Sequence, residues 1–170
     1  LGAEPVPITC NKPIETIQKA DPDRIILSPG PGTPKDPGVC REVIQTYMGQ
    51  VPRIGVCLGH QTIIDTRGGI IKQMERPVHG MTSEIHTTGE GIFNGVPDSF
   101  PAARYHSLTA EPKTLPSVLK VTATTQDDQT IMAVAHRNHP VYGLQFHPES
   151  VMTLAGRIIM KNFLMYGGEC

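Results

Sequence analysis

The sequence predicts an α/β fold with a mixed, mostly parallel sheet and helices on both of its faces. Short apolar runs at residues 25–27 and 53–57 have the pattern of strands that are buried on both sides. Each run is followed by a turn or loop and then by a stretch with helical spacing. This alternation of strand and helix favours a parallel sheet covered by helices.

The first half of the chain alternates element types in order. Residues 6–9 indicate a short edge strand, because Pro5 and Pro7 cannot donate to a ladder. Strands 25–27 and 53–57 are bounded by glycine, proline and aspartate turn residues. Apolar residues at helical spacing, or an apolar stretch between a turn and a glycine, predict three helices, over residues 13–19, 39–48 and 59–67.

The second half is richer in strands. Residues 118–124 and 131–136 flank a polar turn at 126–129 and predict a hairpin. An amphipathic helix over 153–166, ended by the glycines at 167–168, closes the chain. The remaining strands are expected at residues 82–86, 104–108 and 142–146.

Length and charge limit the kind of protein. The 170 residues predict a single domain over residues 1–170 whose core needs no disulfide or metal. A formal net charge of -1 argues against a nucleic-acid or membrane-surface partner and leaves small molecules or another protein. The cysteines at 10, 40, 57 and 170 form no CxxC pair and follow no signal peptide, so we expect free thiols in the cytoplasm. We expect no metal site and no cofactor.

The sharpest local motif is the segment Gly55-Val-Cys57-Leu-Gly59, where a strand runs into a helix. Glycines two residues either side of a nucleophile are typical of a nucleophile elbow, which exposes the side chain at the head of the helix. The helix dipole and a nearby imidazole would favour the thiolate, and the Leu58 N–H is placed to hold an oxyanion. The alternative is that Cys57 is a small apolar core residue.

A second motif, His147-Pro148-Glu149, follows the strand expected at 142–146 and supplies a base. Pro148 holds residue 147 extended, so that the Glu149 carboxylate can orient the imidazole of His147. Nucleophile, base and acid then follow in the order Cys, His, Glu. A structural turn that contains a histidine by chance is the alternative.

A third motif, the glycine-rich loop at residues 28–34, lacks the residues of a dinucleotide or Walker loop, but it exposes backbone N–H groups at Gly30 and Gly32. All three motifs follow separate strands. In a parallel sheet they therefore meet at the carboxyl edge, where open α/β sheets bind ligands.

Taken together, five segments resemble a class I, triad-type glutamine amidotransferase. The segment VHGMTS narrows the resemblance to the subunits that feed ammonia to chorismate-using synthases in anthranilate or aminodeoxychorismate synthesis. The segments are GVCLGHQ (55–61), LSPGPGTP (27–34), RYHSL (104–108), GLQFHPES (143–150) and VHGMTS (78–83).

This resemblance implies a flavodoxin-like fold and a role for each matching residue. Cys57 would attack glutamine, with His147 as the base and Glu149 as its orienting acid. The N–H groups of Leu58 and Gly30 would hold the oxyanion. Glutamine would be bound by Gly30, Pro31, Gly32, Gln61, Ser107 and Leu108, and the synthase would be met by His79, Gly80, Thr82 and Ser83.

The family's first strand and helix have no counterpart before Leu1, so we expect an N-terminally truncated chain. Two alternatives to the amidotransferase stay open on sequence grounds. One is another cysteine hydrolase with the same elbow, and the other is a non-catalytic, truncated amidotransferase fragment.

Overall fold

The computed structural model describes residues 1–166 and contains one seven-stranded sheet, in the order β1-β2-β7-β6-β5-β3-β4. The strands are β1 (Ile25–Leu27), β2 (Arg53–Val56), β3 (Ile71–Thr87), β4 (Ser99–Ala110), β5 (Leu119–Thr125), β6 (Ile131–His136) and β7 (Val141–Leu144). The helices are α1 (Ile14–Ala20), α2 (Cys40–Thr46), α3 (Leu58–Thr66) and α4 (Gly156–Tyr166), with 3-10 turns η1 (Gly91–Phe93) and η2 (Pro112–Thr114).

The sheet is mixed, as predicted, but the expectation that it is mostly parallel is wrong. Among the described residues, only β1–β2 and β2–β7 pair in parallel, and the other four strand pairs are antiparallel. The reason lies in the connections: β5, β6 and β7 follow one another through short turns, and a short turn can join only antiparallel neighbours. Parallel pairing is therefore confined to the half of the sheet that helices connect.

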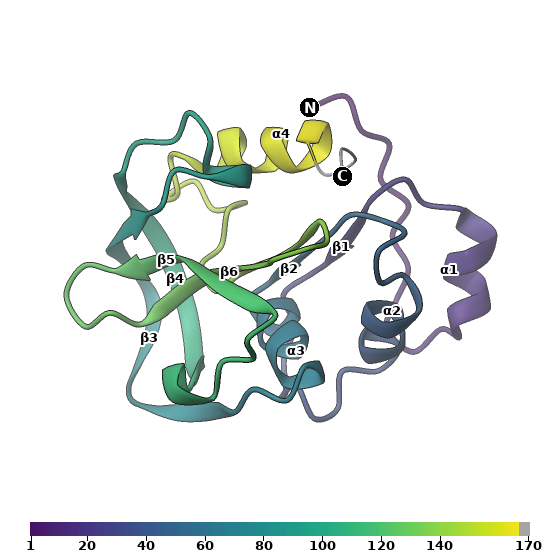
Figure 1. Ribbon diagram of the computed structural model, residues 1–170, viewed down its shortest axis with the longest axis horizontal. Coiled ribbons are helices and arrows are strands. Elements are labelled where there is room, and N and C mark those ends of the chain that lie inside the picture. The colour runs from purple at the N-terminus through teal and green to yellow at the C-terminus, as the bar shows by residue number, and fades with distance from the viewer. Residues whose placement is uncertain (167–170) are drawn as a thin grey trace.

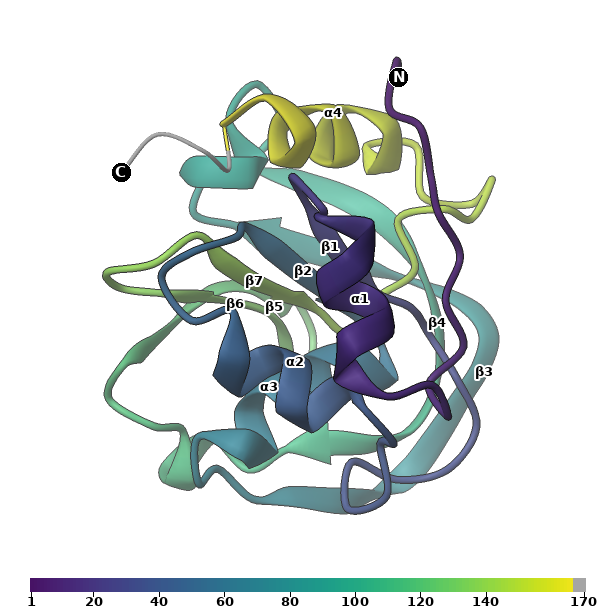
Figure 2. The same cartoon turned by 90° about the vertical axis from the view of Figure 1, so that its right-hand side faces the viewer.

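Helices cover both faces of the sheet, as the sequence predicts. In Figure 1, α4 lies above the sheet, whereas α2 and α3 lie below it, and Figure 2 shows α1 beside α2. One apolar cluster joins Phe163 of α4 and Phe93 of η1 to the upper face, and a second joins Ile44 of α2 and Ile63 of α3 to the lower face. No helix among residues 1–166 has the length and apolar character needed to cross a membrane.

Four expected elements differ most from the structure, and one of them, β4, spans Ser99–Ala110 instead of 104–108. Residues 6–9 form no strand, and Pro5 and Pro7 each remove a donor that a ladder would need. β3 begins at Ile71 instead of 82. The prediction missed its first part because those residues are largely exposed and show no alternation of apolar and polar side chains. Helix α4 begins at Gly156 instead of 153, and its expected end at 167–168 lies outside the described residues.

The turn from β2 into α3 brings backbone segments too close together to leave room for a side chain at Gly55 or Gly59. A Cβ atom placed on Gly59 would lie 2.4 Å from the carbonyl oxygen of Leu27 in β1, and one on Gly55 would lie 2.4 Å from the carbonyl carbon of Gly59. The two glycines are therefore needed for close packing of helix on strand. Their own φ angles are not in the left-handed region, which Cys57 occupies instead at 52°.

We expect Gly59→Ala to lower the free energy of unfolding by about 3 kcal/mol, because the Leu27 backbone cannot move aside as a side chain can. Urea denaturation measures the change. Gly95→Ala is the control, because a Cβ atom on Gly95 would meet no other atom within 4 Å. Gly95 has a φ of 74°, so we expect this variant to lose only about 1 kcal/mol of unfolding free energy through backbone strain. An unchanged midpoint and slope for Gly59→Ala would contradict the close approach.

Candidate active site

Cys57 stands at the junction of β2 and α3 with an unusual backbone. Its φ of 52° and ψ of -102° are strained for a residue with a side chain. The surrounding structure imposes this conformation, since the Cys57 N–H donates to the Leu144 carbonyl at 2.7 Å and Gly55 and Gly59 allow the close turn. The elbow predicted from the sequence is present, with the strain on the cysteine itself.

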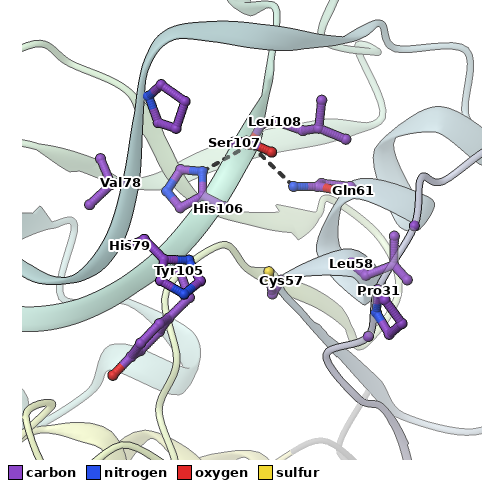
Figure 3. Close-up of a pocket in the computed structure, with 13 residues that line it drawn as sticks. Pro31, Cys57, Leu58, Gln61, Val78, His79, Tyr105, His106, Ser107 and Leu108 are labelled. Atoms are coloured by element: carbon purple, nitrogen blue, oxygen red, sulfur yellow. Dashed lines mark hydrogen bonds between the residues drawn. The ribbon is translucent and has the colours of Figure 1, made fainter.

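A cavity of about 270 Å³ opens beside Cys57 at the carboxyl end of the parallel strands (Figure 3). This volume suits a small ligand, being just below the usual range of about 300–1,000 Å³ for ligand pockets. The cavity brings together every residue predicted to bind glutamine or to hold the oxyanion. Its lining is Gly30, Pro31, Gly32, Cys57, Leu58, Gln61, Pro77, Val78, His79, Tyr105, His106, Ser107 and Leu108.

The Cys57 side chain is buried in the wall of this cavity, with 9% of its surface exposed. Burial raises the pKa of the Cys57 thiol, the Leu58 backbone N–H lowers it, and the charge of Glu149 raises it again. The elbow alone therefore does not favour the thiolate, contrary to the sequence-based expectation, because desolvation outweighs the helix N-terminus. A base has to remove the proton.

His147, the base predicted from the sequence, does not line the cavity. Its Nδ1 donates to Glu149 Oε1 at 2.6 Å, which leaves Nε2 as the basic nitrogen. Nε2 is buried and has no hydrogen-bond partner among residues 1–166. The His147 backbone is fixed on both sides, since its N–H donates to Ala103 and its carbonyl accepts from Thr153.

The ring of Tyr105 connects the base to the cavity. Tyr105 lines the cavity with Cys57 and meets the His147 ring edge to face at 5.1 Å between centroids. The described residues contain no hydrogen bond between Cys57 and His147. Catalytic contacts of this kind are often long without substrate and shorten in the complex.

Two other histidines lie nearby and stay neutral. Burial lowers the pKa of His60 to about 3 and that of His106 to about 4. His106 donates from Nδ1 to the Leu108 carbonyl at 2.8 Å, because a carbonyl can only accept. His106 therefore supports the site, as the sequence predicts, whereas His60 does not line the cavity. Neither is suited to accept a proton at neutral pH.

Gln145 is a site residue that sequence reasoning missed. It is fully buried, and its Nε2 donates to the Cys57 sulfur at 3.8 Å. One signal could have found it, because Gln145 lies in the strand predicted over 142–146 and stands two residues before His147 in the sequence.

The segment expected to meet a partner borders the same cavity. His79 lines the cavity and contacts Tyr105, with 5.6 Å between ring centroids. Gly80, at a φ of 70°, is the extra residue of a β-bulge, because His79 and Met81 pair with the adjacent residues Tyr105 and Arg104. Thr82 is exposed, whereas Ser83 is half-buried and accepts from Arg104.

The remaining cysteines lie away from the cavity lining. Cys10 is exposed, Cys40 is half-buried, and both are free thiols. Cys170 lies outside the described residues. Among residues 1–166, no three His, Cys, Asp or Glu side chains gather in a group that could hold a metal ion.

Comparison with known proteins decides the family, since residues 1–166 match the family described as "Glutamine amidotransferase class-I". The chain belongs to this family. The solved structure of a putative GMP synthase component from Thermoplasma acidophilum has the same fold. Its TM-score is 0.76 at 24% identity, over 89% of this chain and 75% of the other.

Within this family, the chain is similar to named components of anthranilate and aminodeoxychorismate synthases. The chain is 44% identical over 151 residues to "Aminodeoxychorismate/anthranilate synthase component 2" of Bacillus subtilis, covering 89% of this chain and 77% of that protein. It is 48% identical over 151 residues to "Bifunctional protein TrpGD" of Thermotoga maritima, covering 89% of this chain. The chain spans only 26% of the length of that bifunctional protein.

We expect a glutamine-mimicking electrophile to label Cys57 before Cys10, Cys40 or Cys170, and glutamine to protect it. Binding in the cavity holds the reagent against the sulfur, which offsets the raised pKa of the thiol. Peptide mass spectrometry measures the labelling.

Iodoacetamide, which lacks the amino-acid groups, is the control reagent, and we expect it to modify exposed Cys10 faster than Cys57. The same order of labelling with both reagents, or no protection by glutamine, would contradict a glutamine site at Cys57.

Proposed function

We propose that this chain is the glutamine amidotransferase component of a chorismate-using synthase that makes anthranilate or aminodeoxychorismate. In this proposal it hydrolyses glutamine at Cys57 and passes ammonia to its partner subunit. The observation that supports it most directly is the cavity itself, in which the Cys57 sulfur lies beside Leu58, Gly30 and Gln61. Membership of the family and the names of the relatives agree with this chemistry.

The reaction begins with transfer of the Cys57 thiol proton to His147 Nε2. The sulfur then forms a bond to the carboxamide carbon of glutamine, and the Leu58 and Gly30 N–H groups hold the oxyanion. Leu58 is the first residue of α3, so its N–H has no acceptor within the helix. Each such donor contributes about 10²–10³ in rate.

Collapse of the tetrahedral intermediate breaks the carbon–nitrogen bond. His147 returns the proton to the departing amine, which leaves as ammonia. Water, deprotonated by the same Nε2, then attacks the thioester carbon and releases glutamate, and the sulfur regains its proton. Glu149 accepts from Nδ1 throughout, and so it stabilises the imidazolium that forms in each half of the reaction.

The bulged part of β3 is the surface that we assign to the synthase partner, through His79, Gly80, Thr82 and Ser83. It begins at the cavity rim with His79 and continues to exposed Thr82. A partner seated there would cover the cavity mouth and receive ammonia directly. The free thiols of Cys10, Cys40 and Cys57 support a reducing, cytoplasmic compartment.

The direct test is release of glutamate and ammonia from glutamine, with and without a chorismate-using synthase partner. We expect Cys57→Ala to abolish both products in either case. Turnover of unrelated acyl substrates without glutamine turnover would instead support another cysteine hydrolase. A folded chain inactive in both assays, even with the partner, would support a non-catalytic fragment.

We expect His147→Asn and Glu149→Gln to lower glutamine turnover unequally. Loss of the base removes proton transfer, which contributes about 10²–10⁴ in rate. Glu149→Gln keeps an oxygen that can accept from Nδ1, so its loss is smaller. Steady-state glutamate release measures both variants, and near-normal turnover of His147→Asn would overturn the assignment of the base.

We expect Thr82→Lys to weaken coupling of glutamine hydrolysis to aminated product more than hydrolysis itself, because Thr82 is exposed and does not line the glutamine cavity. The ratio of aminated product to glutamate in the assembled complex measures coupling. Glu15→Gln, at an exposed position in α1, is the control. An equal loss of both activities would count against an interface at β3.

A further inference from the structure

The buried side-chain amides of Gln61 and Gln145 form a series of hydrogen bonds that ends at the Cys57 sulfur. Gln145 follows β7, is fully buried, and fixes its backbone by donating from N–H to the Met132 carbonyl at 2.8 Å. Both ends of its side chain have partners. Oε1 accepts from Gln61 Nε2 at 3.1 Å, and Nε2 donates to the Cys57 sulfur at 3.8 Å.

The donor and acceptor ends of the two glutamine amides follow from the contact of Gln61 with the Leu108 carbonyl. The Leu108 carbonyl can only accept, so the group of Gln61 that faces it at 3.2 Å has to be the NH₂. The same NH₂ faces Gln145, which must therefore present its oxygen there. The NH₂ of Gln145 is then the end that faces the sulfur, and the sulfur is the acceptor.

A second branch holds the Leu108 carbonyl in place. His106 Nδ1 donates to the same oxygen, and its Nε2 accepts from Arg104 Nε at 3.0 Å. Figure 3 shows the bonds from His106 and Gln61 meeting at this one carbonyl. Arg104 and His106 are 2% and 4% exposed, so this support is shielded from water.

We propose that Gln145 is a positioning residue that donates to the Cys57 sulfur and stabilises the attacking thiolate. The proposal rests on the proposed function, in which Cys57 is the nucleophile. A carboxamide neither gains nor loses a proton at equilibrium near neutral pH, so Gln145 does not replace His147 as the base. It acts on the charge of the sulfur, because a hydrogen bond to an ionised acceptor is about twice as strong as one to a neutral acceptor.

The hydrogen bond from Gln145 offsets part of the cost of burying a charged sulfur. Burial, followed by the charge of Glu149, raises the pKa of the Cys57 thiol, and the Leu58 N–H opposes that rise. Gln145 supplies a second donor from the end of β7. The other titratable groups that line the cavity or contact its lining are His79, Tyr105, His106, Arg104 and His147, and Glu149 contacts His147. His60 lies in α3.

The test measures the pH dependence of Cys57 alkylation by iodoacetamide, followed on the Cys57 peptide by mass spectrometry. Gln145→Met keeps the length of the side chain and removes the donor. We expect Cys57 to react about tenfold more slowly at neutral pH and to recover at alkaline pH, because the thiol pKa has risen by about one unit. Glutamine turnover should show the same pattern, with kcat reduced more than KM is raised.

Asn162→Leu is the matched control. Asn162 is also a buried amide, and its Nδ2 donates to the Ile92 carbonyl at 2.9 Å and to the Asn94 carbonyl at 2.7 Å, in the cluster around α4. We expect both variants to lose stability, and only Gln145→Met to shift the alkylation profile. Gln145→Glu keeps the side-chain shape and the contact with Gln61 but replaces the donor with an acceptor, so its profile should shift in the same direction.

A wild-type alkylation profile in folded Gln145→Met, or in Gln145→Glu if the first variant does not fold, would overturn the proposal. So would an equal shift in Asn162→Leu. The alkylation assay needs no glutamine turnover, so it tests the role of Gln145 separately from the proposed glutamine hydrolysis. Absence of glutamate release by the wild type would overturn the proposed function, whereas an unmoved thiol profile would overturn only the role of Gln145.

Discussion

The close approach of helix α3 to strands β1 and β2 is the constraint on which the site depends. Gly59 lies so near the Leu27 carbonyl that no side chain fits, and Gly55 lies equally near Gly59. The chain can make this turn only if Cys57 takes a left-handed φ, which costs about 1–3 kcal/mol for a residue with a side chain. Packing of α3 on the sheet stabilises the strained turn and presents both the sulfur and the Leu58 N–H at the cavity.

In the proposed reaction, the rest of the site compensates for the burial of Cys57 in the cavity wall. Burial makes an isolated thiolate unfavourable there and raises the pKa of the Cys57 thiol. Donors from Leu58 and Gln145 oppose the desolvation, and His147 stands on the segment after β7 with Glu149 fixing its tautomer. In the proposed reaction, α3 therefore places the nucleophile in the cavity wall, and the segment after β7 supplies the base and a buried donor.

Local chemistry explains which features the sequence could predict. The elbow at Cys57 and the pair His147–Glu149 depend on glycine and proline spacing within a few residues, and both motifs form. The prediction that the elbow exposes the Cys57 side chain is wrong, because the cavity wall buries it. The extent of the antiparallel half could not be predicted, because the long β3 is exposed over most of its length and pairs with distant residues of β4. The role of Gln145 escaped sequence reasoning for the same reason, since its partners Cys57 and Gln61 come from distant parts of the chain.

The most direct test of a glutamine-cleaving Cys57 is mass spectrometry of the protein quenched in acid during glutamine turnover. We predict one glutamyl group in thioester linkage on the peptide that contains Cys57, formed with release of ammonia and lost as glutamate appears. Glutamate release without any covalent adduct, or with the adduct on another residue, would show that Cys57 is not the nucleophile.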